Sequence, residues 1–283
     1  MTTTEGDPLE AIDHWPVPTA AAGWIDRGGR GGRRGPTDAV FELASVTKPL
    51  VAYAVLVAVE EGSLALDAPV TQPTQPPTDP DLAEVTLRQL LSHASGLNTD
   101  ARSMIAEPQT RRIYSNAGFE LIGDLLEQAT GFTIAAYLHE AVLAPLEMRS
   151  TELRGSPAHR AVSTVEDLLR FCSELMAPTL LDSTTLAAAT TPVFADLGGV
   201  LPGFGRHDPN PWGLGFEIRG EKSPHWTGSA NAPATFGHFG RAGTMLWVDP
   251  VAGRAVVALT DRDFGRWAAE AWPALSNAVL GAA

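Results

Sequence analysis

The sequence predicts an α/β protein of the α+β kind, with one antiparallel sheet formed from both chain ends and flanked by helices. Short β-type runs lie near the N-terminus and beyond about residue 195, whereas the part between them shows mainly helical spacing of apolar residues. We therefore expect an all-helical lobe inserted between the two parts of the sheet. Residues 1–66 plus 191–283 would form the sheet lobe and 67–190 the helical lobe, with the functional site between them.

The N-terminal part is expected to hold two strands and one long helix. Residues 17–26 and 39–43 have the composition of strands, and the Gly/Arg segment between them is interpreted as a flexible hairpin loop. The apolar run over 46–62 predicts a helix that ends at Gly62. A Pro/Thr/Gln-rich stretch at 68–82 is expected to be a loop or short linker.

Several helix signals follow in the central part. The segment TLRQLLSHASG places three leucines on one helical face and stops at Gly96, and NAGFELIGDLLEQATG has helical spacing and stops at Gly131. TIAAYLHEAVLAPL comes next, and then STVEDLLRFCSEL, in which Ser163 or Thr164 can cap a helix.

The C-terminal part of the chain is predicted to form several strands. WGLGFEIRG, ATFGHFG, GTMLWVDP and GRAVVALTD are short β-type runs separated by turn residues. The segment DPVAG at 249–253 is a good hairpin turn, and a final helix is expected over 267–280.

Composition and charge narrow the range of partners. The chain has 44 % hydrophobic and 19 % charged residues, typical of a soluble globular protein, and a formal net charge of −13. This excess of negative charge argues against a nucleic acid or an anionic membrane as partner. Four arginines among glycines at 26–38 could suggest an RNA-binding tail, but a hairpin loop is the favoured interpretation.

Further expectations concern disulfides, metals and location. Cys172 is the only cysteine, which excludes an internal disulfide and a thiolate metal cluster, and its helical setting makes it a core residue. His207, Asp208 and His225 do not form a metal-ligand spacing, so no metal is expected. No signal peptide is visible, and the longest apolar run, residues 50–59, is too short to cross a bilayer. We expect a cytoplasmic protein; the choice between monomer and homo-oligomer stays open.

Ser45 and Lys48 stand out at the start of the first helix. Lysine is scarce, because only Lys48 and Lys222 occur beside 18 arginines. Residues three apart share a helical face, so an amine with a lowered pKa could take the Ser45 proton, which an arginine could not. The Ser45 N–H at the helix start can also face a developing oxyanion. An accidental S-x-x-K pair is the alternative, with about 0.1 matches expected by chance.

Two further motifs supply matching chemistry. Tyr114 and Asn116 form a Y-x-N triplet at a helix start, where the phenol could relay or accept a proton and the amide could hold Lys48 and a substrate carbonyl. The HFG triplet at 238–240 lies on a predicted strand, with small residues that let a ligand lie against the backbone. A buried hydrogen-bonded tyrosine and a structural strand-edge histidine are the alternatives.

S-x-x-K, Y-x-N and a K-T-G-like triplet, in this order, resemble the serine β-lactamase and penicillin-binding-protein superfamily. Tyrosine in the second motif and His-x-Gly in the third are similar to its class C-like branch. That branch includes class C β-lactamases, D-alanyl-D-alanine peptidases, D-amino-acid hydrolases and family VIII carboxylesterases. LDAPV, TLRQLLSHASGL, STVEDLLRF and WGLGFEI also agree, so the resemblance covers about residues 38–262. It implies a β-lactamase/transpeptidase-like fold and a serine hydrolase without metal or other cofactor.

The resemblance implies roles for the first two motifs. Ser45 would be the acylated nucleophile, and Lys48 and Tyr114 would share general-base and general-acid work. Asn116 would position Lys48 and the acyl side chain of the substrate. Which of Lys48 and Tyr114 is the main base stays open at this point.

The third motif is where the chain departs from the usual pattern. His238 replaces the lysine of K-T-G, and Gly240 would leave room for the substrate. The backbone N–H of Arg241 would pair with that of Ser45 as the second oxyanion donor, its side chain lying in solvent. Because histidine is mostly neutral near pH 7, recognition of a substrate carboxylate is less favoured than with lysine. His93 resembles a framework position and is left out of the catalytic set.

The leading hypothesis is a metal-free serine hydrolase that cleaves small esters, with amides or β-lactams as further substrates, through an acyl-enzyme on Ser45. The alternatives are a D-amino-acid peptidase, amidase or β-lactamase, and a catalytically silent protein that binds a ligand in the same cleft. Intact motifs argue against the silent protein, because a pure binder needs no deprotonable amine. Trp212, Trp226 and Phe239 could line an apolar pocket but are as readily core residues, so they stay outside the predicted site.

Overall fold

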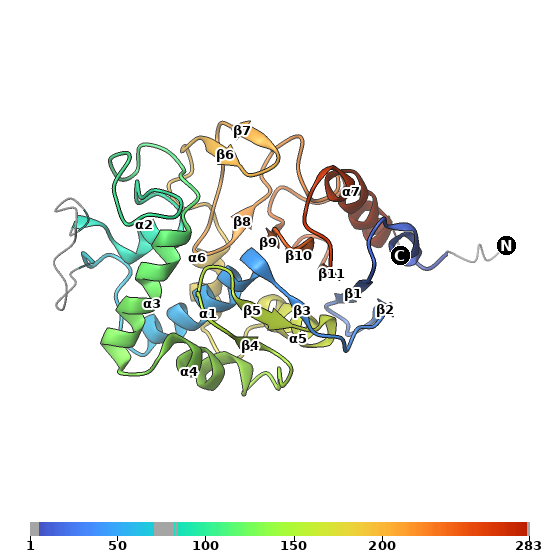
Figure 1. The fold of residues 1–283 in the computed structure, drawn as a ribbon, viewed down its shortest axis with the longest axis horizontal. Helices are drawn as coiled ribbons and strands as arrows, with labels where there is room; N and C mark the ends of the chain where they lie inside the picture. Colours follow the sequence, from blue (N-terminus) through green and yellow to red (C-terminus); the bar gives the residue numbers. More distant parts are fainter. Residues whose placement is uncertain (1–5, 71–81, 83, 282–283) are drawn as a thin grey trace.

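Strands from the two ends of the chain lie side by side in one six-stranded antiparallel sheet, as predicted (Figure 1). The computed structural model describes residues 6–70, 82 and 84–281. Strand β1 (Ala20–Asp26) pairs with β11 (Arg254–Thr260), from Ala20 opposite Thr260 to Asp26 opposite Arg254. The strand order is β2-β1-β11-β10-β9-β8, where β2 is Gly31–Arg34, β8 Glu217–Ile218, β9 Phe236–Gly240 and β10 Thr244–Asp249.

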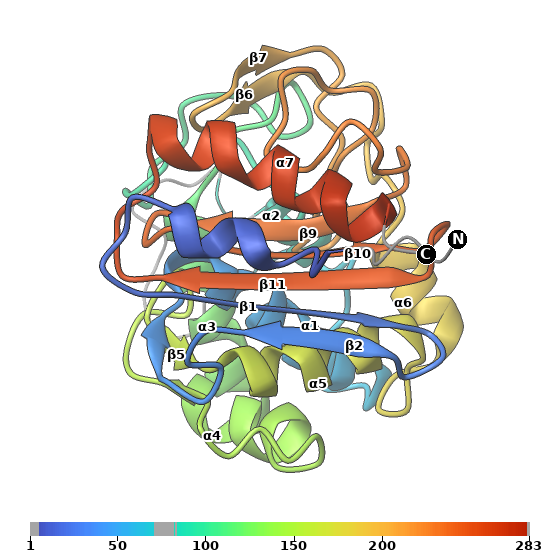
Figure 2. The same ribbon diagram turned by 90° about the vertical axis from the view of Figure 1, so that its right-hand side faces the viewer.

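Helices cover both faces of this sheet, which separates two hydrophobic cores (Figure 2). Helix α7 and the 3-10 helix η1 lie over one face, and α1 and α5 over the other. Because side chains alternate along a strand, neighbouring residues of β10 point to opposite faces. Trp247 packs in the same core as Trp272 of α7, whereas Leu246 packs in the core on the other face. These four helices are η1 Glu10–His14, α1 Thr47–Glu60, α5 Val165–Met176 and α7 Arg266–Gly281.

The central part of the chain adds short helices and two small sheets. The helices are η2 Ala44–Val46, α2 Leu87–Leu91, α3 Asn116–Thr130, α4 Ile134–Leu138, the π-helix η4 His139–Leu143 and α6 Ser183–Ala189. One small sheet has the order β3 (Phe41–Glu42), β5 (Ala161–Ser163), β4 (Glu152–Leu153), and the other pairs β6 (Gly199–Leu201) with β7 (Gly205–His207). Two of the predicted helix boundaries are confirmed. Gly131 ends α3 with φ 75°, and the Thr164 side chain accepts a hydrogen bond from Asp167 N at the start of α5.

The range 67–190 contains more than helices. Strands β4 and β5 fall within it and pair next to β3, and α5 packs across β1, β10 and β11. A Cβ atom at Gly23 of β1 would lie 2.7 Å from Leu169 Cδ1 of α5, so the helix approaches the sheet closely. Sequence periodicity identifies such a helix but not the layer against which it packs; the two-lobe boundaries stay a prediction.

The predicted hairpin between 17–26 and 39–43 does not form. Instead the Gly/Arg segment supplies β2, which pairs with β1, while β3 pairs with β5. Glycines make this edge strand possible, because a Cβ at Gly32 would come within 2.6 Å of Trp24 Nε1. The four arginines have partners in the chain itself: Arg27 the Pro250 carbonyl, Arg30 Asp26, Arg33 Glu166, and Arg34 Asp7 and Asp13.

Helix α1 is almost enclosed by the rest of the protein. Every residue from 47 to 56 is buried, including the charged residue Lys48. Neither α1 nor another helix in the described part of the chain combines the length and apolar character needed to cross a membrane. The enclosure of α1 matters for function because it determines the environment of the amine at its start.

Cys172 allows a test of the packing of α5. Its thiol is fully buried, and burial raises its pKa well above the usual range, so the reactive thiolate is suppressed in the folded state. We expect almost no reaction with a thiol-specific reagent at mildly alkaline pH in native buffer, and complete reaction of one thiol in concentrated guanidinium chloride. Fast labelling of the native protein, measured by intact mass, would contradict the described packing of α5.

Candidate active site

Ser45 lies in η2, at the turn between β3 and α1. Thr244 Oγ1 of β10 donates a hydrogen bond to Leu43 O (2.7 Å), and Leu43 N donates to Ala161 O (2.9 Å). Ala44 has φ 46°, a left-handed conformation that a non-glycine residue keeps only where its surroundings hold it. The backbone that presents Ser45 is therefore fixed by the large sheet and by β5 before the helix begins.

Gly240 has a different purpose from the one predicted. We expected it to leave room for a substrate, but a Cβ at this position would overlap Leu43 O and Thr244 Oγ1 and lie 3.1 Å from Ala44 Cβ. The space beside Gly240 is occupied by the chain itself. Its missing side chain lets β9 lie directly against the backbone before Ser45.

Lys48 lies in the first turn of α1 with no solvent exposure (0 %). Its Nζ donates to Asn116 Oδ1 and to Ala158 O, both at 2.8 Å, and lies 3.4 Å from Ser45 Oγ. Burial lowers the pKa of Lys48 to about 7, although the carboxylates of Glu120 and Asp100 act in the opposite direction. A large fraction of this amine is thus neutral at physiological pH.

The three neighbours of Lys48 determine what the neutral amine can do. The oxygens of Asn116 and Ala158 are carbonyl-type groups that only accept hydrogen bonds. They take up both protons of a neutral amine, which leaves the nitrogen lone pair for the third neighbour, the Ser45 hydroxyl. The arrangement is suited to removing a proton from Ser45.

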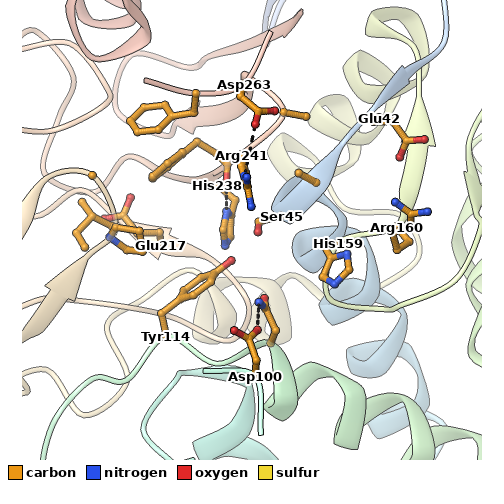
Figure 3. Close-up of a pocket in the computed structure, with 18 of the residues that line it drawn as sticks. Glu42, Ser45, Asp100, Tyr114, His159, Arg160, Glu217, His238, Arg241 and Asp263 are labelled. Atoms are coloured by element: carbon orange, nitrogen blue, oxygen red, sulfur yellow. Dashed lines mark hydrogen bonds and ion pairs between the residues drawn. The ribbon is translucent and has the colours of Figure 1, made fainter. Parts of the chain in front are cut away.

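Tyr114 and Asn116 come from the start of α3. Ser115 between them caps this helix, because its Oγ accepts from Gly118 N at 2.9 Å. The Tyr114 hydroxyl points toward Ser45 (Figure 3), and burial raises the pKa of the phenol above its usual range, so the phenol stays protonated. Asn116 donates through Nδ2 to Asp100 Oδ1 (2.8 Å), which orients its Oδ1 toward the lysine.

The ring of His93 packs against the ring of Tyr114. Its ring centroid is 4.7 Å from that of Tyr114 and 4.6 Å from that of Trp212, and its Nδ1 accepts from Ser115 N at 3.2 Å. Burial holds the pKa of His93 well below its usual value, so the ring is neutral. These contacts fit the framework role that the sequence resemblance implied.

His238 lies on β9, opposite Leu246 of β10, and is only 3 % exposed. Its ring centroid is 5.9 Å from that of Tyr114 and 5.5 Å from that of Trp212. Burial, followed by the nearby charge of Lys48, lowers the pKa of His238 to about 3. The third motif therefore offers no positive charge from this residue.

The residues predicted for the site meet around one cavity of about 880 Å³ (Figure 3). Ser45, Tyr114, Asn116, His238 and Arg241 line it, whereas Lys48 lies behind Ser45 and Gly240 supports the wall. The Arg241 side chain is 87 % exposed, with Nε 3.5 Å from Asp263 Oδ2, as a solvent-facing arginine should be. The lining also includes residues not predicted for the site, among them Glu42, Asp100, His159, Arg160, Leu201, Pro202, Trp212, Glu217, Phe239, Asp263 and Phe264.

A family model described as Beta-lactamase matches residues 13–280, almost the whole chain. The chain belongs to the Beta-lactamase family. This is a family of β-lactamase-fold serine hydrolases, in agreement with the resemblance seen in the three motifs.

Relatives of this Beta-lactamase family member differ in the activities that their names state. A crystal structure titled as a beta-lactamase (Mb2281c) from Mycobacterium bovis is 49 % identical, covers 97 % of this chain and 98 % of its own, and superposes with a TM-score of 0.91. Esterase EstB of Burkholderia gladioli is 36 % identical over 46 % of this chain and 42 % of its own length. Penicillin-binding protein 4* of Bacillus subtilis is 28 % identical over 41 % of this chain and 31 % of its own. The matched parts thus span less than half of these two curated relatives.

A buried ionic cluster borders the cavity of this Beta-lactamase family chain. Glu217 of β8 accepts hydrogen bonds from Lys222 Nζ, His225 Nε2 (3.1 Å) and Trp226 Nε1 (2.8 Å). Burial acts to raise the pKa of Glu217, but His225 and Lys222 outweigh it and hold the carboxyl ionised. Sequence reasoning missed this cluster; its signal was Lys222, the second of the two lysines.

Gly240 provides a stability test of the contact that presents Ser45. Gly240→Ala should lower the free energy of unfolding by about 1–3 kcal/mol, because the new methyl group overlaps the backbone before Ser45. Gly118→Ala is the matched control: its nearest atoms lie 3.5 Å or more from the new Cβ, and alanine favours α3 by up to about 1 kcal/mol. Equal denaturation midpoints for Gly240→Ala and the wild type would contradict the described packing.

Proposed function

We propose that this protein is a serine hydrolase that cleaves small esters through an acyl-enzyme on Ser45. One observation carries the proposal: the Nζ of the fully buried Lys48 lies 2.8 Å from each of two carbonyl oxygens and 3.4 Å from Ser45 Oγ. If the two carbonyl oxygens take the protons of the neutral amine, its lone pair faces the Ser45 hydroxyl. Such an amine is a suitable general base near neutral pH, because its pKa is about 7.

Acylation would begin with Ser45 Oγ attacking the ester carbonyl carbon while its proton passes to Lys48 Nζ. The first hydrogen bond of η2 runs from Val46 N to Leu43 O. The backbone N–H of Ser45 lies one residue earlier and takes no part in this bond. In the proposal this N–H and that of Arg241, just beyond β9, stabilise the negative oxygen of the tetrahedral intermediate.

Tyr114 is assigned the general acid. Its hydroxyl remains protonated and lies in the cavity wall beside Ser45, so it is available to the oxygen that leaves the carbonyl carbon. As the C–O bond breaks, the leaving alkoxide takes the Tyr114 proton, which the Lys48 ammonium then replaces. Water attacks the acyl-enzyme next, and Lys48 accepts its proton. As the bond between the acyl carbon and Ser45 Oγ breaks, the Lys48 ammonium returns this proton to Oγ, which releases the acid and regenerates Ser45 and the neutral amine.

Esters are the favoured substrates for two reasons. Esterase EstB is a relative, and the third motif of this chain has a neutral histidine in place of a cation. Aromatic side chains of Trp212, Phe239 and Phe264 line the cavity and suit an apolar acyl or alcohol group. The small-molecule ester is the only partner that the proposal requires.

A second candidate function is β-lactam hydrolysis. The 49 % identity to a protein whose structure is titled a beta-lactamase favours it, and lactam opening would use the same acylation of Ser45. The cavity lacks a fixed cation from residue 238, which a β-lactam carboxylate would need. We therefore expect turnover of a chromogenic cephalosporin well below that of a p-nitrophenyl ester, measured by absorbance at equal enzyme concentration.

Covalent labelling tests the assignment of the nucleophile. A fluorophosphonate probe should add one adduct to the wild type, seen in the intact mass, and abolish turnover of a p-nitrophenyl ester. Ser45→Ala should show neither adduct nor turnover, whereas Ser183→Ala, an exposed serine of α6, should behave as wild type. An adduct on Ser45→Ala, or no adduct and no turnover in the wild type, would reject the proposed function.

The pH dependence of acylation tests the base. Since Lys48 must be neutral to accept a proton, the labelling rate should rise with pH through an apparent pKa near 7 and level off above it. Lys48→Arg replaces the amine by a guanidinium that stays protonated and cannot act as a base. This variant should slow labelling by about 10²–10⁴-fold. A rate that is flat over about pH 5 to 9, or that rises only where tyrosine ionises, would assign the base elsewhere.

A further inference from the structure

One hydrogen bond determines which nitrogen of His238 carries the proton. Nδ1 lies 2.7 Å from the carbonyl oxygen of Phe239. A carbonyl oxygen can only accept, so Nδ1 must be the protonated nitrogen. In the neutral ring the other nitrogen, Nε2, then has a lone pair and no proton, and it can act only as a hydrogen-bond acceptor.

This acceptor has no partner among the described residues of the protein. Nε2 of His238 is buried and makes no hydrogen bond, although the residue lines the cavity beside Ser45. Buried polar atoms are rarely left unpaired, because the loss of hydration is then uncompensated. The Tyr114 ring is a neighbour of the His238 ring, but its hydroxyl makes no hydrogen bond to Nε2. A ligand group is the natural partner for Nε2.

The charges around the cavity indicate what that ligand group can be. The carboxylates of Glu42, Asp100, Glu217 and Asp263 are part of the lining. Its arginines, Arg160 and Arg241, are exposed, and Arg241 already faces Asp263. A carboxylate placed next to His238 would meet the lone pair of Nε2, which is unfavourable in a desolvated site.

We propose that His238 Nε2 accepts a hydrogen bond from the alcohol part of the substrate, so that the preferred substrates are uncharged esters of diols or polyols. The inference rests on the proposed function, in which the leaving oxygen takes its proton from Tyr114. Because the rings of His238 and Tyr114 are neighbours at 5.9 Å, the alcohol side of the ester passes closest to His238. A hydroxyl one or two carbons from the ester oxygen supplies the donor.

Three esters of phenylacetic acid with matched alcohols test this assignment. The ethyl ester has no group at the probed position, the 2-hydroxyethyl ester has a donor, and the carboxymethyl ester has an anion. We expect the wild type to show a kcat/KM for the 2-hydroxyethyl ester about 3- to 10-fold above that of the ethyl ester. The carboxymethyl ester should be at least about tenfold slower than the ethyl ester. Release of phenylacetate, followed by liquid chromatography, gives all three values.

Two variants attribute the selectivity to His238, and each is compared only as a ratio between substrates. His238→Leu should bring the ratio of 2-hydroxyethyl to ethyl ester close to one, because the acceptor is gone. His238→Lys should raise the ratio of carboxymethyl to ethyl ester by about tenfold or more, because a cation replaces the lone pair. Fluorophosphonate labelling of Ser45 and the thermal midpoint confirm that each variant is folded. If a variant does not fold, long-range ¹H–¹⁵N correlation spectra of the wild type decide, since they show which nitrogen of His238 carries the proton.

The outcomes separate the inference from the function on which it rests. Absence of hydrolysis of every ester by the wild type rejects the proposed function and the inference with it. Hydrolysis with equal rates for the ethyl and 2-hydroxyethyl esters keeps the hydrolase and overturns the role of His238; Nε2 is then satisfied by water. A proton on Nε2 in the correlation spectra overturns it as well.

Discussion

The buried amine of Lys48 connects parts of the protein that are far apart in the chain. Its contacts reach Asn116 at the start of α3, the Ala158 carbonyl before β5, and Ser45 in its own segment. An amine in such a place is costly unless it is hydrogen-bonded or neutral, and here it is both hydrogen-bonded and close to its pKa at physiological pH. The fold around it must therefore hold two carbonyl oxygens at fixed positions.

The backbone before Ser45 is also fixed by contacts with distant segments. Thr244 and Ala161 bond Leu43 from two different sheets, and the bare backbone of Gly240 lets β9 approach Ala44. The strained φ of Ala44 is maintained by these contacts. A nucleophile fixed in this way loses little conformational freedom in the reaction, and that is the advantage of building the site on the sheet.

Both lysines of the chain are buried beside the same cavity, yet their environments differ. Lys48 is surrounded by carbonyl groups and has a lowered pKa that leaves it partly neutral. Lys222 bonds the carboxylate of Glu217, and this ion pair with His225 and Trp226 stabilises the wall formed by β8. Burial lowers the pKa of Lys222 too, although the Glu217 carboxylate opposes this. The two lysines differ in their partners, since Lys48 lies next to the Ser45 hydroxyl and Lys222 next to a carboxylate.

Local sequence determined much of this protein. The periodicity, caps and turns placed α1, α3, α5, α7 and the β10–β11 hairpin, and three motifs in a fixed order identified the family and the pair of Ser45 and Lys48. These features depend on neighbours within a few residues, which a sequence displays directly. Tertiary structure alone decided the rest: β2 pairs with β1, Gly240 makes room for Ala44, Glu217 binds Lys222, and the proton of His238 lies on Nδ1. Each of these depends on a contact between distant segments or on the direction of one side chain, and neither is encoded in the spacing of residues along the chain.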